Sequence, residues 1–396
     1  ESSASKHLRN TAFEMSLFGT GVMKGPFAVD KEYASWDDET GEYSPTFKTV
    51  PQVSHVSVWN FYPDPDANNM DEAQYVIERH KMSRSQMRGL KKRPYFRAQV
   101  IDDAISLGEN YDKEYWEDDL SDYAPEYGVE RFEVLEYWGV IDAKFAKEVG
   151  MEGTEGLTEF DQMQVNVWVC GNMILRCVVN PFTPARIPFQ AFPFEINPDQ
   201  IWGVGVAENM EDAQMLMNGH VRMAIDNLAL AGNLVFDVDE ASLVPGQNMD
   251  IFPGKIFRRQ SGVTGTAING LKFPNTAGEN IQMYQIRRQL ADEETGIPSI
   301  MHGQTGVTGT GRTAAGLSML MGSAGLSMKT VIKNIDDHLL KPLGEAYFQW
   351  NMQFNERTPE KIGDLEIKPK GTSAVIQKEV RTQRLTALLQ TVANPM

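Results

Sequence analysis

Residues 208–231, ENMEDAQMLMNGHVRMAIDNLALA, decide the fold of this chain. Small and apolar residues recur there at helical spacing on one stripe, namely Met210, Ala213, Met217, Val221, Ala224 and Leu228. Gly232 follows as a C-terminal cap. The stretch therefore predicts an amphipathic helix roughly 30 Å long, at a rise of ~1.5 Å per residue.

The next residues predict a small β insertion and a second long helix. Residues 234–275 combine strand-like runs with Pro-Gly pairs at 245–246 and 253–254. Thr276 and Glu279 have the spacing of a capping box, and the helical pattern that they begin ends at Gly296. The order is thus helix, β insertion, helix.

A Gly/Thr-rich loop, His302–Thr313 (HGQTGVTGTGRT), follows the second helix. A long helical pattern then runs from about Ala314 to Phe354 and is interrupted by Pro342, which predicts a kink. A short strand at Leu365–Lys368 and an amphipathic helix at about 378–393 are expected to close the chain.

The first half mixes helices and strands. Lys6–Leu17 predicts a helix, Val53–Phe61 a strand, and Asp71–Arg79 a short strand or helix. Ser83–Lys91 predicts a short helix with Ser83 as its N-cap.

Antiparallel strands are expected further on. Arg131–Asp142 alternates like a strand, and Met163–Val179 predicts a hairpin that turns at Gly171-Asn172. The proline-rich stretch 181–198 predicts an extended connector without a regular element. The fold class is therefore α+β.

Composition excludes several classes of protein. Hydrophobic residues make up 41% of the 396 residues, so the chain can bury a core and is not a disordered protein. The 37 Lys and Arg against 54 Asp and Glu give a net charge of −17, which argues against a DNA-binding regulator. No apolar run approaches the ~20 residues of a membrane span, and no signal peptide is expected. Cys170 and Cys177 are interpreted as reduced core thiols.

Charge is segregated in the first half. The chain is basic from Arg79 to Arg97 and acidic from Asp102 to Asp122. We interpret the two runs as solvated faces, or as surfaces that meet between subunits. A nucleic-acid contact by the basic run is the less favoured alternative, because the run holds few aromatic residues.

No catalytic, metal or cofactor site is predicted. Gly306–Thr313 has the spacing of a phosphate-binding loop, but Arg312 stands where the lysine should be and no strand precedes it, so a P-loop-like NTPase is a minor alternative. Surface or packing roles are expected for the histidines, which lack metal-ligand spacing: His7, His55, His80, His220, His302 and His338.

The order of these parts resembles the portal proteins of tailed bacteriophages. Local sequence is also similar to that family: Trp59-Asn-Phe-Tyr-Pro-Asp-Pro-Asp, Pro188-Phe-Gln-Ala-Phe-Pro-Phe-Glu-Ile-Asn-Pro, Trp202-Gly-Val-Gly, Glu211-Asp-Ala-Gln-Met-Leu-Met-Asn and Arg222-Met-Ala-Ile-Asp-Asn. The resemblance covers about residues 50–390. It implies a wing (1–204), a first stem helix (205–232), a clip (233–275), a second stem helix (276–297), a tunnel loop (298–313), a further wing part with the long kinked helix (314–372) and the start of a helical crown (373–396).

The resemblance also implies a function. The family forms a ring, of twelve copies, at the capsid vertex of the virion, through which double-stranded DNA is packaged and ejected without sequence-specific contacts. Its partners are the terminase large subunit, the tail adaptor protein and the major capsid protein, and assembly takes place in the bacterial cytoplasm. Another structural or scaffold protein of a large assembly is the alternative from a different class.

Three groups of site residues follow from the resemblance. In the tunnel loop, Gln304, Thr305, Thr308, Thr310 and Arg312 are expected to face DNA. In the clip, Lys255, Arg258 and Arg259 are expected to meet partner proteins, or a neighbouring subunit's acidic groups. On the stem helices, Arg222, Arg287 and Arg288 are expected to form inter-subunit salt bridges or to contact phosphates.

Overall fold

The computed structural model of the chain describes residues 4–36, 41, 43–120, 130–233, 235–252, 254–262, 264–296, 329–354, 367–369 and 385. It is a mixed α+β structure, as predicted. The chain forms two compact units, one from Glu1–Glu208 with Gly325–Met396 and one from Asn209–Ala324. In the described part of the chain, no helix combines the length and the hydrophobicity that a membrane span needs.

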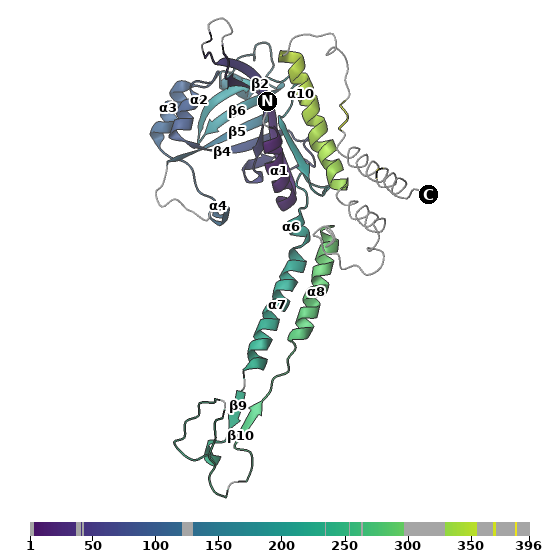
Figure 1. Ribbon diagram of the computed structural model, residues 1–396. Helices are drawn as coiled ribbons and strands as arrows, with labels where there is room; N and C mark the ends of the chain where they lie inside the picture. The colour runs from purple at the N-terminus through teal and green to yellow at the C-terminus, as the bar shows by residue number, and fades with distance from the viewer. Residues whose placement is uncertain are drawn as a thin grey trace, which may run out of the picture. The chain divides into compact units, whose positions relative to one another are not determined.

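A five-stranded antiparallel sheet dominates the first unit (Figure 1). Its strands, in spatial order, are β3 (Phe61–Pro63), β4 (Tyr75–Ser83), β5 (Arg131–Asp142), β6 (Gln162–Cys170) and β7 (Met173–Val179). The predicted hairpin is confirmed, because β6 pairs with β7 across a turn at Gly171, which has a φ of +57°. The helix α5 (Ala143–Glu148) lies between β5 and β6 along the chain.

Two helices cover one face of this sheet, α2 (Arg84–Leu90) and α3 (Ala98–Leu107) (Figure 1). Met87 and Ile101 pack on Phe132 and Leu175 of the sheet in one buried cluster. The predicted N-cap is confirmed: the Ser83 hydroxyl accepts a hydrogen bond from the Gln86 amide, and the Gln86 side chain accepts one from the Ser83 amide.

A three-stranded sheet has the order β2 (Thr46–Val56), β1 (Thr20–Tyr33) and β8 (Phe189–Pro193). The prediction that 181–198 holds no regular element is wrong, since β8 is a fully buried edge strand paired with β1. Proline interrupts only its borders, at Pro188 and Pro193, and an edge strand tolerates the missing donor there.

The predicted strand Val53–Phe61 is likewise divided. β2 ends at Val56, a 3-10 turn η1 (Val58–Asn60) follows, and Phe61 begins β3 in the other sheet. The alternation of side chains continues through a change of sheet, so periodicity alone could not locate the break.

The remaining core of the first unit joins α1 to the C-terminal helical segment. The helix α1 (Ala4–Phe18) confirms the predicted N-terminal helix. Residues 329–335 are helical, a π-helical turn spans Asp336–Leu340, and α10 (Lys341–Phe354) follows. Pro342 therefore follows directly after the π-helical turn, and the helical run continues through it. The irregularity of this segment thus lies just before Pro342. Met15, Met23, Phe192, Leu339 and Leu343 form the buried cluster between these elements.

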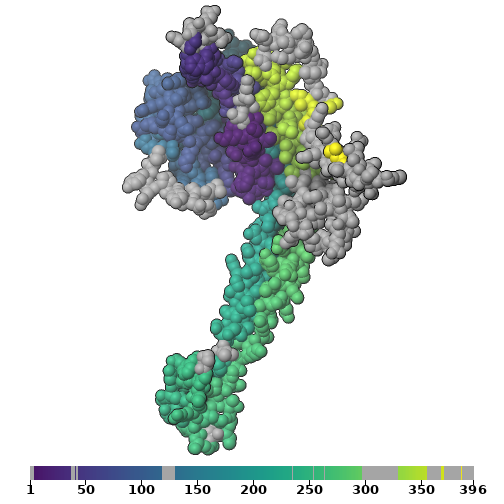
Figure 2. Space-filling view, viewed as in Figure 1, coloured from purple at the N-terminus to yellow at the C-terminus, as the bar shows by residue number. Residues whose placement is uncertain are grey.

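The second unit is a pair of long helices with a β ribbon. α7 (Glu211–Gly232) and α8 (Ala277–Glu294) lie side by side along their length (Figure 2). β9 (Val235–Val238) pairs antiparallel with β10 (Ile268–Leu271) between them in sequence, and a 3-10 turn η2 spans Glu240–Ser242. A separate short helix, α6 (Val206–Asn209), precedes α7, so the predicted single helix from Glu208 is interrupted at Met210.

The predicted capping box at Thr276 is wrong. The Thr276 side chain makes no capping hydrogen bond. Instead, Oδ1 of Asn275 accepts from the Ala277 amide at 3.0 Å, and Oδ1 of Asn227 accepts from the Thr276 amide at 2.8 Å. A side chain of α7 thus fixes the start of α8, a long-range contact that the local pattern does not contain.

Candidate functional site

The two-helix unit exposes an unusual amount of apolar surface. Its 22-residue helix α7 buries only Ala213 and Ala224, and its 18-residue helix α8 buries only Ala277 and Ala291. The larger apolar side chains of the two helices are exposed: Met215, Leu216, Val221, Met223, Ile225, Leu228, Leu230, Ile281, Met283, Ile286 and Leu290. Exposed apolar side chains in this number on two paired helices are typical of a protein interface.

Polar side chains connect α7 with α8 and with the residues just before α8. His220 Nδ1 lies 3.3 Å from Asn280 Oδ1, and Asn227 Nδ2 donates to the carbonyl oxygen of Pro274 at 3.1 Å. Only small alanines of the two helices are buried, and the large apolar side chains keep much of their surface exposed. The helix pair alone therefore leaves many large apolar side chains partly in contact with solvent.

The three predicted basic residues of these helices differ in exposure. Arg222 and Arg288 are exposed, and Arg287 is half-buried. None of them has a salt bridge within the described residues. Their side chains are thus available to partners outside the chain, and the choice between a neighbouring subunit and DNA stays a prediction.

The loops after β9 carry the second predicted group. Lys255 Nζ lies 5.2 Å and 5.4 Å from the ring centroids of Phe252 and Phe257. Arg259 donates to the carbonyl oxygen of Gly265. The Arg258 amide donates to Oε1 of Gln247, and the Arg258 carbonyl oxygen accepts from Nε2 of the same side chain. The three cations therefore lie in one small loop region, which also exposes the apolar side chains Met249, Ile251, Phe252 and Ile256.

The third predicted group belongs to the Gly/Thr-rich loop. Its residues, Gln304, Thr305, Thr308, Thr310 and Arg312, lie outside the described residues.

The basic and acidic runs of the first unit meet each other within the chain. Arg79 lies 2.7 Å from Glu133 and 3.7 Å from Glu114, and Lys81 lies 2.7 Å from Glu117 of α4 (Tyr115–Leu120). The prediction of separate solvated faces is therefore wrong for these residues. The pairing also neutralises part of the basic run that the nucleic-acid alternative required.

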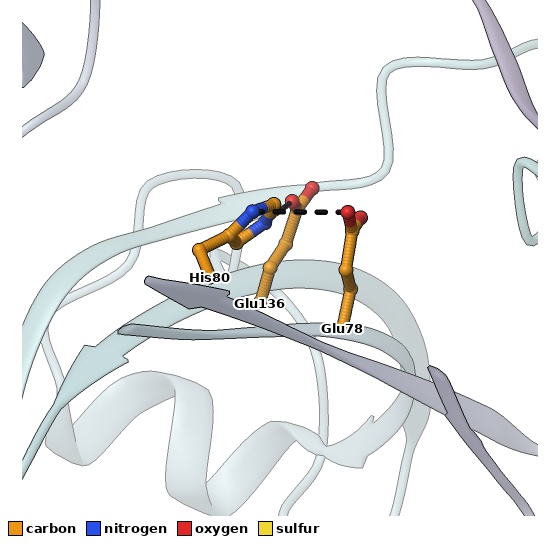
Figure 3. Close-up of side chains that lie close together, drawn as sticks. All are labelled: Glu78, His80 and Glu136. Atoms are coloured by element: carbon orange, nitrogen blue, oxygen red, sulfur yellow. Dashed lines mark hydrogen bonds and ion pairs between the residues drawn. The ribbon is translucent and has the colours of Figure 1, made fainter. Parts of the chain in front are cut away.

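A buried ionic cluster joins the two sheets. Lys24 of β1 places Nζ 2.5 Å from Oε2 of Glu78 on β4 and 2.5 Å from Oε2 of Glu136 on β5. His80 of β4 places Nε2 2.7 Å from the same Glu136 oxygen (Figure 3). Trp138 donates its indole N–H to Oε1 of Glu136 at 2.7 Å. Each carboxylate is thus neutralised although it is withdrawn from water.

Charge pairing dominates the protonation of this cluster. Burial alone would raise the pKa of Glu136, but the charge of Lys24 and the hydrogen bond with His80 lower it to about 2. Burial likewise opposes protonation of Lys24, yet the charges of Glu136 and Glu78 raise its pKa. Lys24 and Glu136 therefore stay charged, as an ion pair, over a wide range of pH.

The same side chains resemble a metal-binding set. Ligand atoms of Glu78, His80 and Glu136 lie within 4.8 Å of one another. The Lys24 ammonium, however, already lies against both carboxylates, where a metal ion would compete with it. His80 also stacks on Trp168 with ring centroids 5.0 Å apart. The geometry favours a structural role, in agreement with the packing role predicted for His80.

Sequence reasoning missed this cluster. Lys24 is separated from Glu78 by 54 positions and from Glu136 by 112, so no local spacing connects them. One signal was present: Glu136 is a charged residue between apolar and aromatic neighbours in the run Val134–Trp138, Val-Leu-Glu-Tyr-Trp. Buried carboxylates require a partner, and that requirement could have directed a search for a buried cation.

Comparison with known proteins adds one match. A family model described as phage SU10 portal protein matches residues 37–360 of the chain. No curated protein matches it.

Proposed function

The chain belongs to the phage portal protein family, and from this premise we propose that its copies form the ring through which double-stranded DNA enters and leaves the capsid. The ring has twelve copies in this proposal, and it is positioned at the head-tail vertex of the virion. The family is structural, and the chain acts as a conduit and docking ring rather than as an enzyme.

The exposed apolar surface of α7 and α8 is the observation that carries the proposal. Neighbouring copies would bury the side chains that one helix pair leaves outside, and a ring repeats this contact until it closes. Met215 and Ile225, 64% and 60% exposed, are the largest contributions on α7. In this assignment α7 and α8 are the stem, and residues 233–275 are the clip.

Partners follow from the position of each part. The clip loops combine the cations Lys255, Arg258 and Arg259 with exposed apolar side chains, a chemistry that suits acidic, partly apolar partner surfaces. We assign these loops to the terminase large subunit during packaging and to the tail adaptor protein afterwards. The major capsid protein would meet the first unit, and assembly would take place in the bacterial cytoplasm.

Charge supports passage rather than tight binding of DNA. The net charge of −17 repels phosphate, so that DNA inside an acidic ring does not adhere to its wall. In this proposal the polar Gly/Thr loop 302–313 contacts DNA with little positive charge, through Gln304, Thr305, Thr308, Thr310 and Arg312.

Analytical ultracentrifugation of stem variants tests the proposal. Leu228→Glu and Ile286→Glu each place a charge on an exposed apolar position of the helix pair. We expect both variants to stay folded and to sediment as monomers, because burying an unpaired charge in a subunit contact costs several kcal/mol. Phe160→Glu, at a position 91% exposed in the first unit, is the matched control and should assemble like the wild type. Monomeric wild-type protein, or unchanged assembly of both stem variants, would contradict the proposal.

A further inference from the structure

A cavity of about 550 Å³ lies in the first unit between β7, residues 95–97 and residues 150–153. Its size falls within the range of small-molecule sites. Among its lining residues, Arg97 and Arg176 are cationic and Glu152 is the acidic one. The cavity therefore carries a positive balance in a chain whose net charge is −17.

Arg176 on β7 has an unsatisfied donor. Its Nε is buried and has no hydrogen-bond partner within the described residues. Burial lowers the pKa of this guanidinium, and nearby Arg93 lowers it further, although Glu136 acts in the opposite direction. The group lies 5.3 Å from the ring centroid of Phe96. An arginine held in this way costs stability unless an acceptor reaches it.

Tyr95 is a second unusual residue of the same cavity. Its φ is +66°, the left-handed conformation that side chains other than glycine rarely adopt, and it is the one non-glycine residue with positive φ in the described chain. Its side chain is 67% exposed. Backbone strain that leaves an aromatic ring in solvent beside a cationic cavity is typical of ligand sites.

We propose that this cavity binds a nucleotide 5′-phosphate, with the phosphate on Arg176 and Arg97 and the base against Tyr95. The guanidinium fork matches phosphate oxygens in a bidentate arrangement. A phosphate monoester has three terminal oxygens and can accept from both arginines at once, whereas a carboxylate has only two. An exposed aromatic ring offers a stacking surface for a base. A free nucleotide and the 5′ end of a single strand share this chemistry.

Binding by the full-length protein to two probes tests the site. Fluorescence anisotropy with a labelled 5′-phosphorylated single-stranded oligonucleotide, and calorimetry with AMP, should both give saturable binding. Tighter binding of AMP would identify a free nucleotide as the ligand, and tighter binding of the oligonucleotide would identify the strand end. Arg176→Met should weaken binding at least tenfold, while Arg88→Met, with the same loss of charge on the exposed surface of α2, should leave it unchanged.

Thermal stability separates a ligand site from a structural one. Arg176→Met removes the unsatisfied donor and Tyr95→Gly relieves the positive φ, so both variants should melt at a higher temperature than the wild type without ligand. Lower melting temperatures for both would assign these residues to the structure and overturn the proposal. So would the absence of binding, equal weakening by Arg88→Met, or tighter binding of a triglutamate peptide, which would indicate an acidic protein partner.

Discussion

Lys24 Nζ lies 2.5 Å from Oε2 of Glu136 and thereby links the three-stranded sheet to the five-stranded sheet. Both side chains are almost fully buried. Removal of one partner from such a pair leaves an uncompensated charge, and two neighbouring carboxylates share this lysine.

Lys24→Met should therefore destabilise the first unit by about 3–5 kcal/mol. Urea denaturation, followed by fluorescence, measures the free energy of unfolding. Lys48→Met is the control, because Lys48 is exposed and contacts only the Tyr33 ring among the interactions described for it. If Lys24→Met lowers the free energy of unfolding by less than about 1 kcal/mol, the value typical of an exposed pair, the buried ion pair does not stabilise the unit as described.

Stability should fall as the solution becomes acidic, with a contribution from Glu136. Its folded pKa of about 2 is lower than the reference value of 4.5, so its stabilising effect is complete above about pH 4.5 and is lost as the pH falls towards 2. Denaturation curves between pH 6 and pH 2.5 test this. Glu136→Gln should show a flatter dependence than the wild type over that interval, and equal slopes would show that Glu136 does not contribute.

Gly203→Ala should destabilise the first unit by several kcal/mol, because overpacking a tight contact forces the backbone to move. A Cβ at this position would lie 2.5 Å from Cβ of Pro193 and 2.6 Å from the carbonyl oxygen of Gly19. Gly89→Ala, in α2 with open space around it, should instead stabilise by about 0.5–1 kcal/mol through helix propensity. Melting temperatures of the two variants should thus move in opposite directions, and a shared direction would show that the Gly203 contact is loose.

Deletion of Gly306 to Gly309 tests the loop that the family resemblance assigns to the channel. We expect rings to assemble normally, because the deletion leaves α7 and α8 unchanged. Packaging or retention of DNA should be impaired, and the DNA content of purified virions measures this. Normal DNA content would remove the loop from the translocation path.

Local patterns predicted the parts of the fold that local forces determine. The helix of residues 208–231, the hairpin at Gly171 and the N-cap at Ser83 follow from periodicity, turn chemistry and capping, and each was found with small shifts of its bounds. β8 was missed because its prolines lie only at its borders, and whether a proline interrupts a strand depends on which neighbour the strand pairs with.

The contacts of the candidate site that the sequence did not predict are long-range ones. The contacts of Arg79 with Glu114 and Glu133, like that of Lys24 with Glu136, join residues that only the folded sheets bring together. The helical stripe predicted for α7 was only part of the answer. Ala213 and Ala224 of that stripe are buried, whereas Val221 and Leu228 of the same stripe are exposed. The pattern could not reveal that most other large apolar side chains of α7 are exposed as well.

Electron microscopy of the purified full-length protein tests the central claim most directly. Class averages should show rings around a central channel, and the rotational symmetry counted from top views should be twelvefold. Globular monomers without rings, in a preparation that is shown to be folded, would contradict the portal assignment of the helix pair.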